Sequence, residues 1–143
     1  MIDPLHLLQR FGLGGYVPTR EENRILFEVR TADLSRVIQT LKKTHALPLK
    51  TVAGSDERGT GSGFRIYYVF GIPKENIFLI PFLSVDPKES SFPSLTAEDQ
   101  EFAMYEREIL TFFGLMPVGH PVPERITLHA ENFPKDIHPL RKE

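Results

Sequence analysis

The chain has 143 residues, the size of a single ordinary domain, and it contains no cysteine. The lack of thiols excludes disulfides, thiolate zinc sites and cysteine-ligated iron–sulfur clusters bound by this chain. The formal net charge of −2 gives no general attraction for nucleic acid or anionic lipid. No apolar run is long enough to span a bilayer, and the N-terminal stretch lacks the apolar core of a signal peptide. These features indicate a soluble protein of a reducing compartment.

The first part of the chain alternates between helical and strand-like patterns. Asp3 followed by Pro4 is typical of a helix start. In chain order we predict a helix at 3–11, a strand at 23–30, a helix from Thr31 to about residue 46, and strands at 47–53, 63–72 and 76–85. We expect a polar, glycine-rich loop at 54–63. Its segment GTGSG at 59–63 lacks the lysine of a phosphate-binding loop and precedes a strand, so we expect a hairpin loop there.

The last predicted helix covers 97–113. Thr96 is expected to cap its N-terminus, with Asp99 three residues on as a short capping box, and Gly114 is expected to end it. Its apolar residues recur at a spacing of three to four, which predicts one buried face.

Two parts of the chain are predicted: a globular domain at 1–114 and an extended, proline-rich docking arm at 115–143. The prolines of the arm disfavour long helices and central strands, and long segments of this kind are usually functional or docking elements. The order of elements predicts an α+β fold, a ferredoxin-like sandwich whose helices lie on one face of a mostly antiparallel sheet.

Glu106 lies on the border of the apolar face of the last helix, where a carboxylate is costly unless it is paired. We predict that it pairs with Arg125 or Arg141 of the arm. Glu106 and Glu108 diverge by about 200° around the helix, so they cannot act as an acid and a base on one substrate. An independent enzyme that uses His120 with one of these carboxylates is an alternative, and it requires a lined pocket.

Two binding functions are further alternatives. An RNA-binding role is open because the strand 63–72 carries four aromatic residues that could stack on bases, but the net charge of −2 favours a role in the core. A metal site at His120, His129 and His138 is disfavoured, because histidines nine residues apart among prolines lack the usual ligand spacing.

Several separated motifs stand in a fixed order in the last part of the chain: FPSLT at 92–96, YERE at 105–108, Phe-Gly at 113–114, Gly-His-Pro at 119–121, Arg125, and His-Pro-Leu-Arg-Lys at 138–142. Together they resemble the "30 kDa" subunit family of respiratory complex I, the bacterial NADH–quinone oxidoreductase. The resemblance covers about residues 23–143 and departs from the family at Thr111, where Asp is usual, and at 122–124, where Asp-Leu-Arg is common. Its weakened consensus and short length are closer to the family's branch in energy-converting, membrane-bound nickel–iron hydrogenases.

The resemblance implies a non-catalytic peripheral-arm subunit of a membrane-associated oxidoreductase, at the cytoplasmic face of the inner membrane. It implies that this chain binds no cofactor, and that iron–sulfur clusters and a nickel–iron or quinone site belong to partner subunits. The implied partners are a large catalytic subunit (49 kDa-like or a hydrogenase large subunit) and neighbouring iron–sulfur subunits. Nucleic acid and a membrane span are not expected.

The same resemblance places the expected subunit interface in the motifs. Arg125, Arg141 and Lys142 are expected to pair with partner carboxylates, and Phe133 and Leu140 to act as apolar anchors. The expected interface residues are Tyr105, Glu106, Arg107, Glu108, Phe113, Gly114, Gly119, His120, Pro121, Arg125, Phe133, His138, Pro139, Leu140, Arg141 and Lys142.

Overall fold

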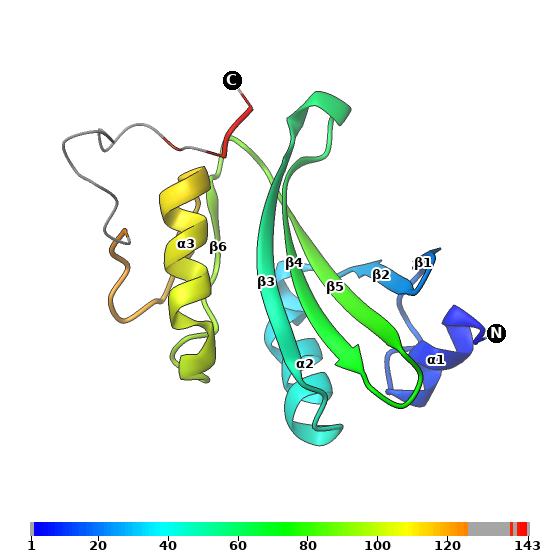
Figure 1. The fold of residues 1–143 in the computed structure, drawn as a ribbon. Helices are drawn as coiled ribbons and strands as arrows, with labels where there is room; N and C mark the ends of the chain where they lie inside the picture. The colour runs from blue at the N-terminus through cyan, green and yellow to red at the C-terminus, as the bar shows by residue number, and fades with distance from the viewer. Residues whose placement is uncertain (1, 126–137, 139, 143) are drawn as a thin grey trace. The chain divides into compact units, whose positions relative to one another are not determined.

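A computed structural model (Figure 1) describes residues 2–125, 138 and 140–142 of the chain. The chain forms two compact units. Unit 1 consists of Met1–Thr51 and Ile66–Ser84, and unit 2 consists of Val52–Arg65 and Val85–Glu143. The units do not divide at residue 114, because the last long helix and the described residues after it belong to the same unit. Within the described residues, no helix has the length and apolar character that crossing a membrane requires.

A five-stranded sheet with the strand order β1-β2-β5-β4-β3 runs through the chain. β1 pairs antiparallel with β2, and β2 pairs parallel with β5. β4 and β5 are neighbours joined by a short turn, which only antiparallel strands allow. The predicted α+β class is confirmed, and β1 and the parallel pair are additions to it. The strands are β1 (Pro18–Glu21), β2 (Arg24–Glu28), β3 (Leu49–Glu57), β4 (Gly63–Ile72) and β5 (Ile77–Val85).

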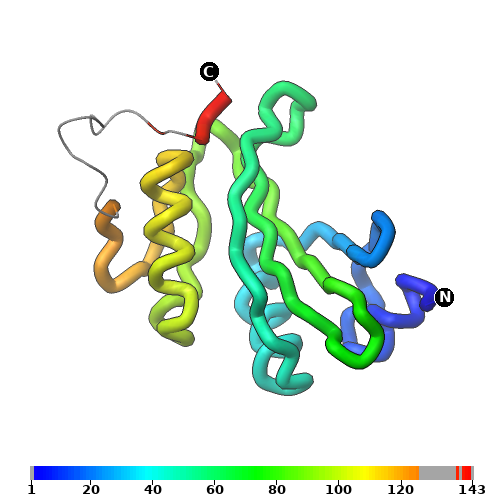
Figure 2. The backbone as a smooth tube through the Cα atoms, viewed as in Figure 1, coloured from blue at the N-terminus to red at the C-terminus, as the bar shows by residue number. Residues whose placement is uncertain are grey.

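The helices of unit 1 begin with α1 (Pro4–Arg10), which Asp3 caps as predicted by accepting a hydrogen bond from the Leu5 amide at 3.2 Å. The second helical region is continuous but changes its winding. It runs from a 3₁₀ turn, η1 (Thr31–Asp33), through α2 (Leu34–Gln39) into a π-helical turn, η2 (Thr40–Thr44). Figure 2 follows the backbone through these elements.

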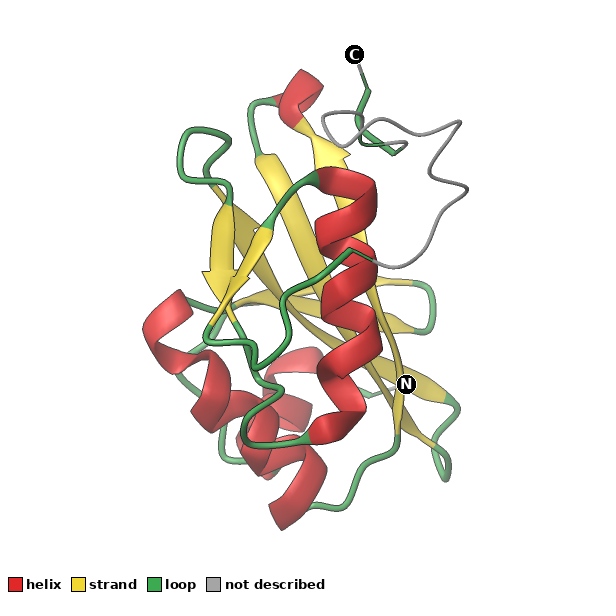
Figure 3. Ribbon diagram, turned by 90° about the vertical axis from the view of Figure 1, so that its left-hand side faces the viewer, coloured by secondary structure: helices red, strands yellow, loops and turns green. Residues whose placement is uncertain are grey.

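Unit 2 contains α3 (Ala103–Phe113) and a small parallel sheet of β6 (Ser91–Pro93) and β7 (Met116–Val118), visible beside the helix in Figure 3. It also contains two 3₁₀ turns, η3 (Arg58–Thr60) and η4 (Gln100–Phe102). Two expectations are corrected here. The predicted arm begins with a strand instead of an extended segment without elements, and the helix predicted from residue 97 begins at Ala103.

β4 carries the aromatic residues on which the RNA-binding alternative depends. Phe64, Tyr68 and Phe70 are at most 1% exposed, since they point into the core with Ile66 between them. Residues buried to this degree are not available to stack on bases. The strand therefore supplies core packing, and the RNA-binding alternative gains no support.

Candidate functional site

Most of the predicted interface residues gather around α3 in unit 2. The helix is preceded by η4, where the Asp99 carboxylate accepts a hydrogen bond from the Glu101 amide at 3.0 Å. It ends at Gly114, whose φ of 74° lies in the left-handed region that favours glycine, as expected. Asp99 thus acts at the start of the helical region, while Thr96 has another role.

Glu106 is fully buried and is held by hydrogen bonds, not by an arginine. Its Oε1 accepts from the hydroxyls of Ser94 and Thr96, each at 2.5 Å, and its Oε2 accepts from the Leu95 amide at 2.7 Å. The predicted pairing with Arg125 or Arg141 is therefore wrong. Three donors from one loop satisfy the carboxylate without a cation. Hydrogen bonds of this kind can stabilise a buried carboxylate in place of an ion pair.

The Ser94–Thr96 loop is the part of the site that the sequence reasoning missed. Thr96 is 1% exposed and donates to Glu106, so its predicted role as a helix cap is wrong. The Ser94 hydroxyl also accepts from the Thr96 amide at 3.1 Å, which fixes the loop around the carboxylate. Two hydroxyl residues shortly before a helix with an inward-facing glutamate are the signal that could have revealed this arrangement.

The Gly-His-Pro motif follows β7 and fastens the chain to the first turn of α3. His120 is 8% exposed, its Nε2 lies 3.2 Å from the carbonyl oxygen of Ala103, and its Nδ1 accepts from the Val122 amide at 3.0 Å. These contacts fit a neutral imidazole with its proton on Nε2. Gly119, with a φ of 94°, provides the left-handed turn that leads into the motif.

Arg107 binds the segment that comes after this motif. Its Nε donates to the carbonyl oxygen of Glu124 at 2.8 Å, and its second terminal nitrogen donates to that of Arg125 at 3.4 Å. Its guanidinium therefore joins the middle of α3 to residues 124–125. The Thr111 hydroxyl, at the position where Asp is usual in the family, donates to the Arg107 carbonyl one turn earlier at 2.8 Å.

The C-terminal His-Pro-Leu-Arg-Lys motif covers the end of α3. The last carbonyls of a helix lack intrahelical donors. Here His138 Nδ1 lies 3.3 Å from the Thr111 oxygen, and the Leu140 amide donates to the Phe112 oxygen at 3.0 Å. Arg141 Nε donates to the Phe113 oxygen at 2.6 Å. Three consecutive carbonyls thus receive contacts from one short segment of the same chain.

The same segment also contacts β3 and β4 within unit 2. Asp56 is 3% exposed, pairs with Arg58 at 2.7 Å and accepts from the Lys142 amide at 2.6 Å. The hydrogen bond from Arg58, followed by that from Lys142, holds the pKa of the Asp56 carboxyl well below its usual range. The guanidiniums of Arg58 and Arg141 lie 4.9 Å and 5.1 Å from the centre of the Phe64 ring, at cation–π distance. We call this set of contacts the C-terminal clasp: residues 138 and 140–142 with Asp56, Arg58, Phe64 and the end of α3.

The predicted interface residues therefore divide into two groups. Glu106, Arg107, His120, His138 and Arg141 contact groups of their own unit, and Phe113 is buried. Tyr105 and Glu108 are half-buried, and Leu140 is 54% exposed, so these three lie at the surface. Phe133 and Pro139 lie outside the described residues, as does His129. A contact of any of these residues with a partner stays a prediction.

The independent-enzyme alternative gains no support from this geometry. Both ring nitrogens of His120 are engaged with backbone groups, and Glu106 is surrounded by donors of its own loop. A general base needs a free position near a substrate proton. Within the part of the chain that the structure describes, no group of three His, Asp or Glu residues could hold a metal ion.

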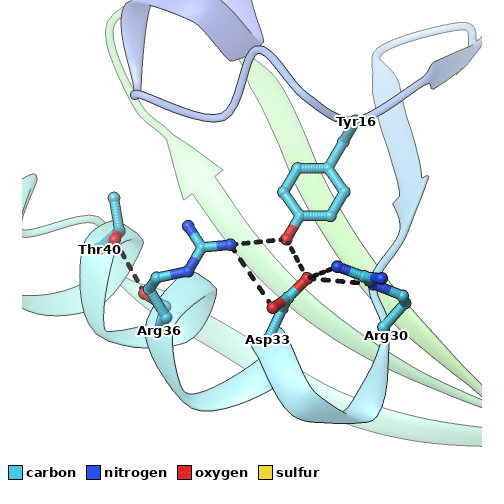
Figure 4. A network of polar contacts seen from close by, with 5 residues as sticks. All are labelled: Tyr16, Arg30, Asp33, Arg36 and Thr40. Atoms are coloured by element: carbon cyan, nitrogen blue, oxygen red, sulfur yellow. Dashed lines mark hydrogen bonds and ion pairs between the residues drawn. The ribbon is translucent and has the colours of Figure 1, made fainter.

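Unit 1 has a separate open pocket of about 620 Å³ between the loop after α1 and the start of the second helical region. In it, the Tyr16 hydroxyl donates to Asp33 at 3.1 Å and accepts from Arg36 at 3.0 Å (Figure 4). Arg30 pairs with the same carboxylate at 3.3 Å. The hydrogen bond from Tyr16 is the main reason why the pKa of Asp33 is lowered, and burial is the main reason why the pKa of Tyr16 is raised.

The charges of this pocket compensate one another. The lining contains two guanidiniums, of Arg30 and Arg36, and two carboxylates, of Glu28 and Asp33, so it presents no net positive charge for an anion. No sequence pattern singled these residues out, because they come from two segments about 15 residues apart. The network fastens the loop after α1 to the second helical region.

The fold and the α3 site together define an α+β domain in which the polar motif residues mainly join segments of the chain. The chain belongs to the family of the respiratory-chain NADH dehydrogenase 30 Kd subunit, whose model matches residues 27–143. The resemblance indicated by the motifs is thereby confirmed.

Two curated relatives show the range of this family. Hydrogenase-4 component G of Escherichia coli (strain K12) is 32% identical over 121 residues, which are 84% of this chain and 22% of that protein. An NADH-quinone oxidoreductase subunit of Roseiflexus sp. (strain RS-1) is 29% identical over 117 residues, which are 80% of this chain and 64% of that protein. The chain thus spans about a fifth of the hydrogenase relative and less than two thirds of the quinone reductase relative.

Solved structures share the fold at low sequence identity. A trypsin-resistant fragment of Nqo5 superposes with a TM-score of 0.69 at 16% identity, over 82% of this chain and 96% of that one. A chain of the membrane-bound sulfane sulfur reductase, an archaeal respiratory membrane complex, superposes with a TM-score of 0.75 at 14% identity, over 95% of this chain and 82% of that one. These likenesses support the α+β fold.

Proposed function

We propose that this chain is a non-catalytic part of the peripheral arm of a membrane-associated oxidoreductase complex, where it braces the large catalytic subunit. The observation that carries the proposal is the family match over residues 27–143, together with an α3 site whose polar motif residues are engaged within their own unit. A protein of this kind acts through its surface and not through a reaction centre.

Cofactors belong to the partners in this proposal. The chain has no cysteine and so cannot supply thiolate ligands to an iron–sulfur cluster or a nickel–iron centre. The partners are a large catalytic subunit, of the 49 kDa or the hydrogenase type, and neighbouring iron–sulfur subunits. The complex would lie at the cytoplasmic face of the inner membrane, with this chain peripheral to it.

We favour the hydrogenase branch over complex I. The hydrogenase relative is 32% identical and the quinone reductase relative is 29% identical. The weakened consensus at Thr111 and at 122–124 points in the same direction.

The experiment is purification of the tagged chain from gently solubilised membranes of its native organism, followed by mass spectrometry of the bound proteins and metal analysis. Nickel together with a hydrogenase-type large subunit supports the favoured branch. A nickel-free complex with quinone-reductase subunits supports the complex I branch. The absence of any stoichiometric partner refutes the proposed function.

A further inference from the structure

The outward side of α3 carries a row of residues of which two, Met104 and Phe112, are apolar. Among the motif side chains, Arg107 reaches this row by donating to the Met104 sulfur at 3.6 Å. Met104, Glu108 and Phe112 follow one another at four-residue steps, so they lie on the same side of the helix. Met104 is 53% exposed, and Glu108 and Phe112 are half-buried. The buried side of the helix, which carries Glu106, faces in another direction.

Two exposed aliphatic residues extend the row at both ends of the helix. At the C-terminal end, the Leu140 amide binds the Phe112 oxygen, which places the 54% exposed Leu140 beside the last turn. At the N-terminal end, His120 binds the Ala103 oxygen and accepts from the amide of Val122, which is 51% exposed. Each of the two residues therefore lies close to one end of α3, where it can extend the row.

Glu108 lies in the middle of this row and has no hydrogen-bond or ion-pair partner among the residues that the structure describes. Its neighbour Arg107 is directed to the carbonyls of Glu124 and Arg125 and to the sulfur of Met104, so it does not neutralise Glu108. A half-buried carboxylate among apolar side chains gains from an opposite charge on a docking surface.

The small sheet of unit 2 is a poorer docking element. Pro93 in β6 and Pro117 in β7 have no amide hydrogen, so neither strand offers a complete edge for strand addition. The C-terminal clasp is likewise occupied by contacts of its own unit.

We propose that Met104, Glu108 and Phe112, extended by Val122 and Leu140, form a docking row for a protein surface that is apolar and places a lysine or arginine opposite Glu108. This inference rests on the proposed function, and it specifies the surface through which the chain would bind the large catalytic subunit. It selects Glu108 and Leu140 from the expected interface residues and adds Met104, Phe112 and Val122 to them.

The test uses the full chain, tagged, in its native organism, with Glu108→Lys and with Glu89→Lys as the matched control. Glu89 is an exposed carboxylate of the same unit, in the loop before β6. Glu108→Lys is expected to lower the co-purified large subunit by about tenfold or more, because it replaces an attraction at the row with a repulsion. Glu89→Lys is expected to leave the yield unchanged.

A photo-crosslinking residue at position 104, with position 89 as the control, provides a second readout that does not depend on how Glu108→Lys folds. A crosslink from position 104 to a lysine- or arginine-containing peptide of the large subunit supports the docking row. Normal assembly of Glu108→Lys, or a crosslink from position 89 and none from 104, overturns the row while the proposed function stands. If the wild-type chain brings down no partner, the proposed function and the row fail together.

Discussion

Replacement of Glu106 tests the internal organisation of unit 2 most directly. The carboxylate accepts two hydroxyl hydrogen bonds and one amide hydrogen bond and is fully buried. In Glu106→Ala the Leu95 amide loses its acceptor, the hydroxyls lose a charged partner and a void opens beneath the loop. We expect the free energy of unfolding to fall by about 3–5 kcal/mol, the range found when buried charged networks are broken. That is a large share of the total of roughly 5–15 kcal/mol available to a small domain.

Glu106→Gln separates hydrogen bonding from charge. The amide carbonyl of glutamine can accept from Leu95, and the hydroxyls of Ser94 and Thr96 can rotate to accept from its amino group. We therefore expect a smaller loss, about 1–2 kcal/mol, since bonds to a charged acceptor are replaced by neutral ones. A dependence on charge through an arginine would instead make glutamine about as harmful as alanine.

The assay is urea unfolding followed by far-ultraviolet circular dichroism, with tyrosine fluorescence as a second probe because the chain has no tryptophan. Glu108→Ala, two residues along the same helix and directed outward, is the control and should change stability by no more than about 0.5 kcal/mol. A loss below about 1 kcal/mol for Glu106→Ala, or equal losses for alanine and glutamine, would refute the reasoning.

Three further outcomes follow from unit 2. The neighbouring guanidinium lowers the folded-state pKa of Asp56. The contribution of Asp56 to stability is therefore complete above the unfolded-state pKa of about 4 and is lost as the pH falls below that value. The difference in free energy of unfolding between wild type and Asp56→Asn should shrink from pH 6 to pH 2, and a difference that widens contradicts this. Gly54→Ala places a Cβ 2.6 Å from the Phe113 ring and should cost about 1–3 kcal/mol in thermal unfolding, whereas Gly59→Ala, with open space around it, should cost much less. Arg141→Ala should cost about 1–2 kcal/mol and speed amide exchange in the last turn of α3, and unchanged exchange there would argue against the clasp.

The strands of the main sheet were predictable because their signals are local. The strongly apolar stretches predicted as strands at 63–72 and 76–85 became β4 and β5 with boundaries within one residue. A short, nearly continuous apolar run of this kind is typical of a buried strand. β1 was missed because its four residues, Pro-Thr-Arg-Glu, form an edge strand with only half-buried and exposed side chains.

The start of α3 and the β6–β7 pair were not predictable, because tertiary contacts decide them. Thr96 and Asp99 are both good capping residues, and only the buried carboxylate of Glu106 determines that Thr96 turns inward. β6 and β7 are three residues long, and each contains a proline, which ordinarily argues against a strand. They pair because α3 brings residues 91–93 and 116–118 together, and no local pattern reports that.

The same reasoning explains why the predicted ion pair of Glu106 was wrong. A buried carboxylate and a set of arginines on a proline-rich segment predict an ion pair. In the structure, hydroxyls and an amide satisfy Glu106, and Arg141 donates to a helix carbonyl that has no intrahelical donor. Once these groups are engaged, the carboxylate without a partner in the described part of α3 is Glu108, whose outward position had excluded it from the buried face. A docking surface is therefore better sought at Glu108 and its exposed neighbours than in the motif residues that build the unit.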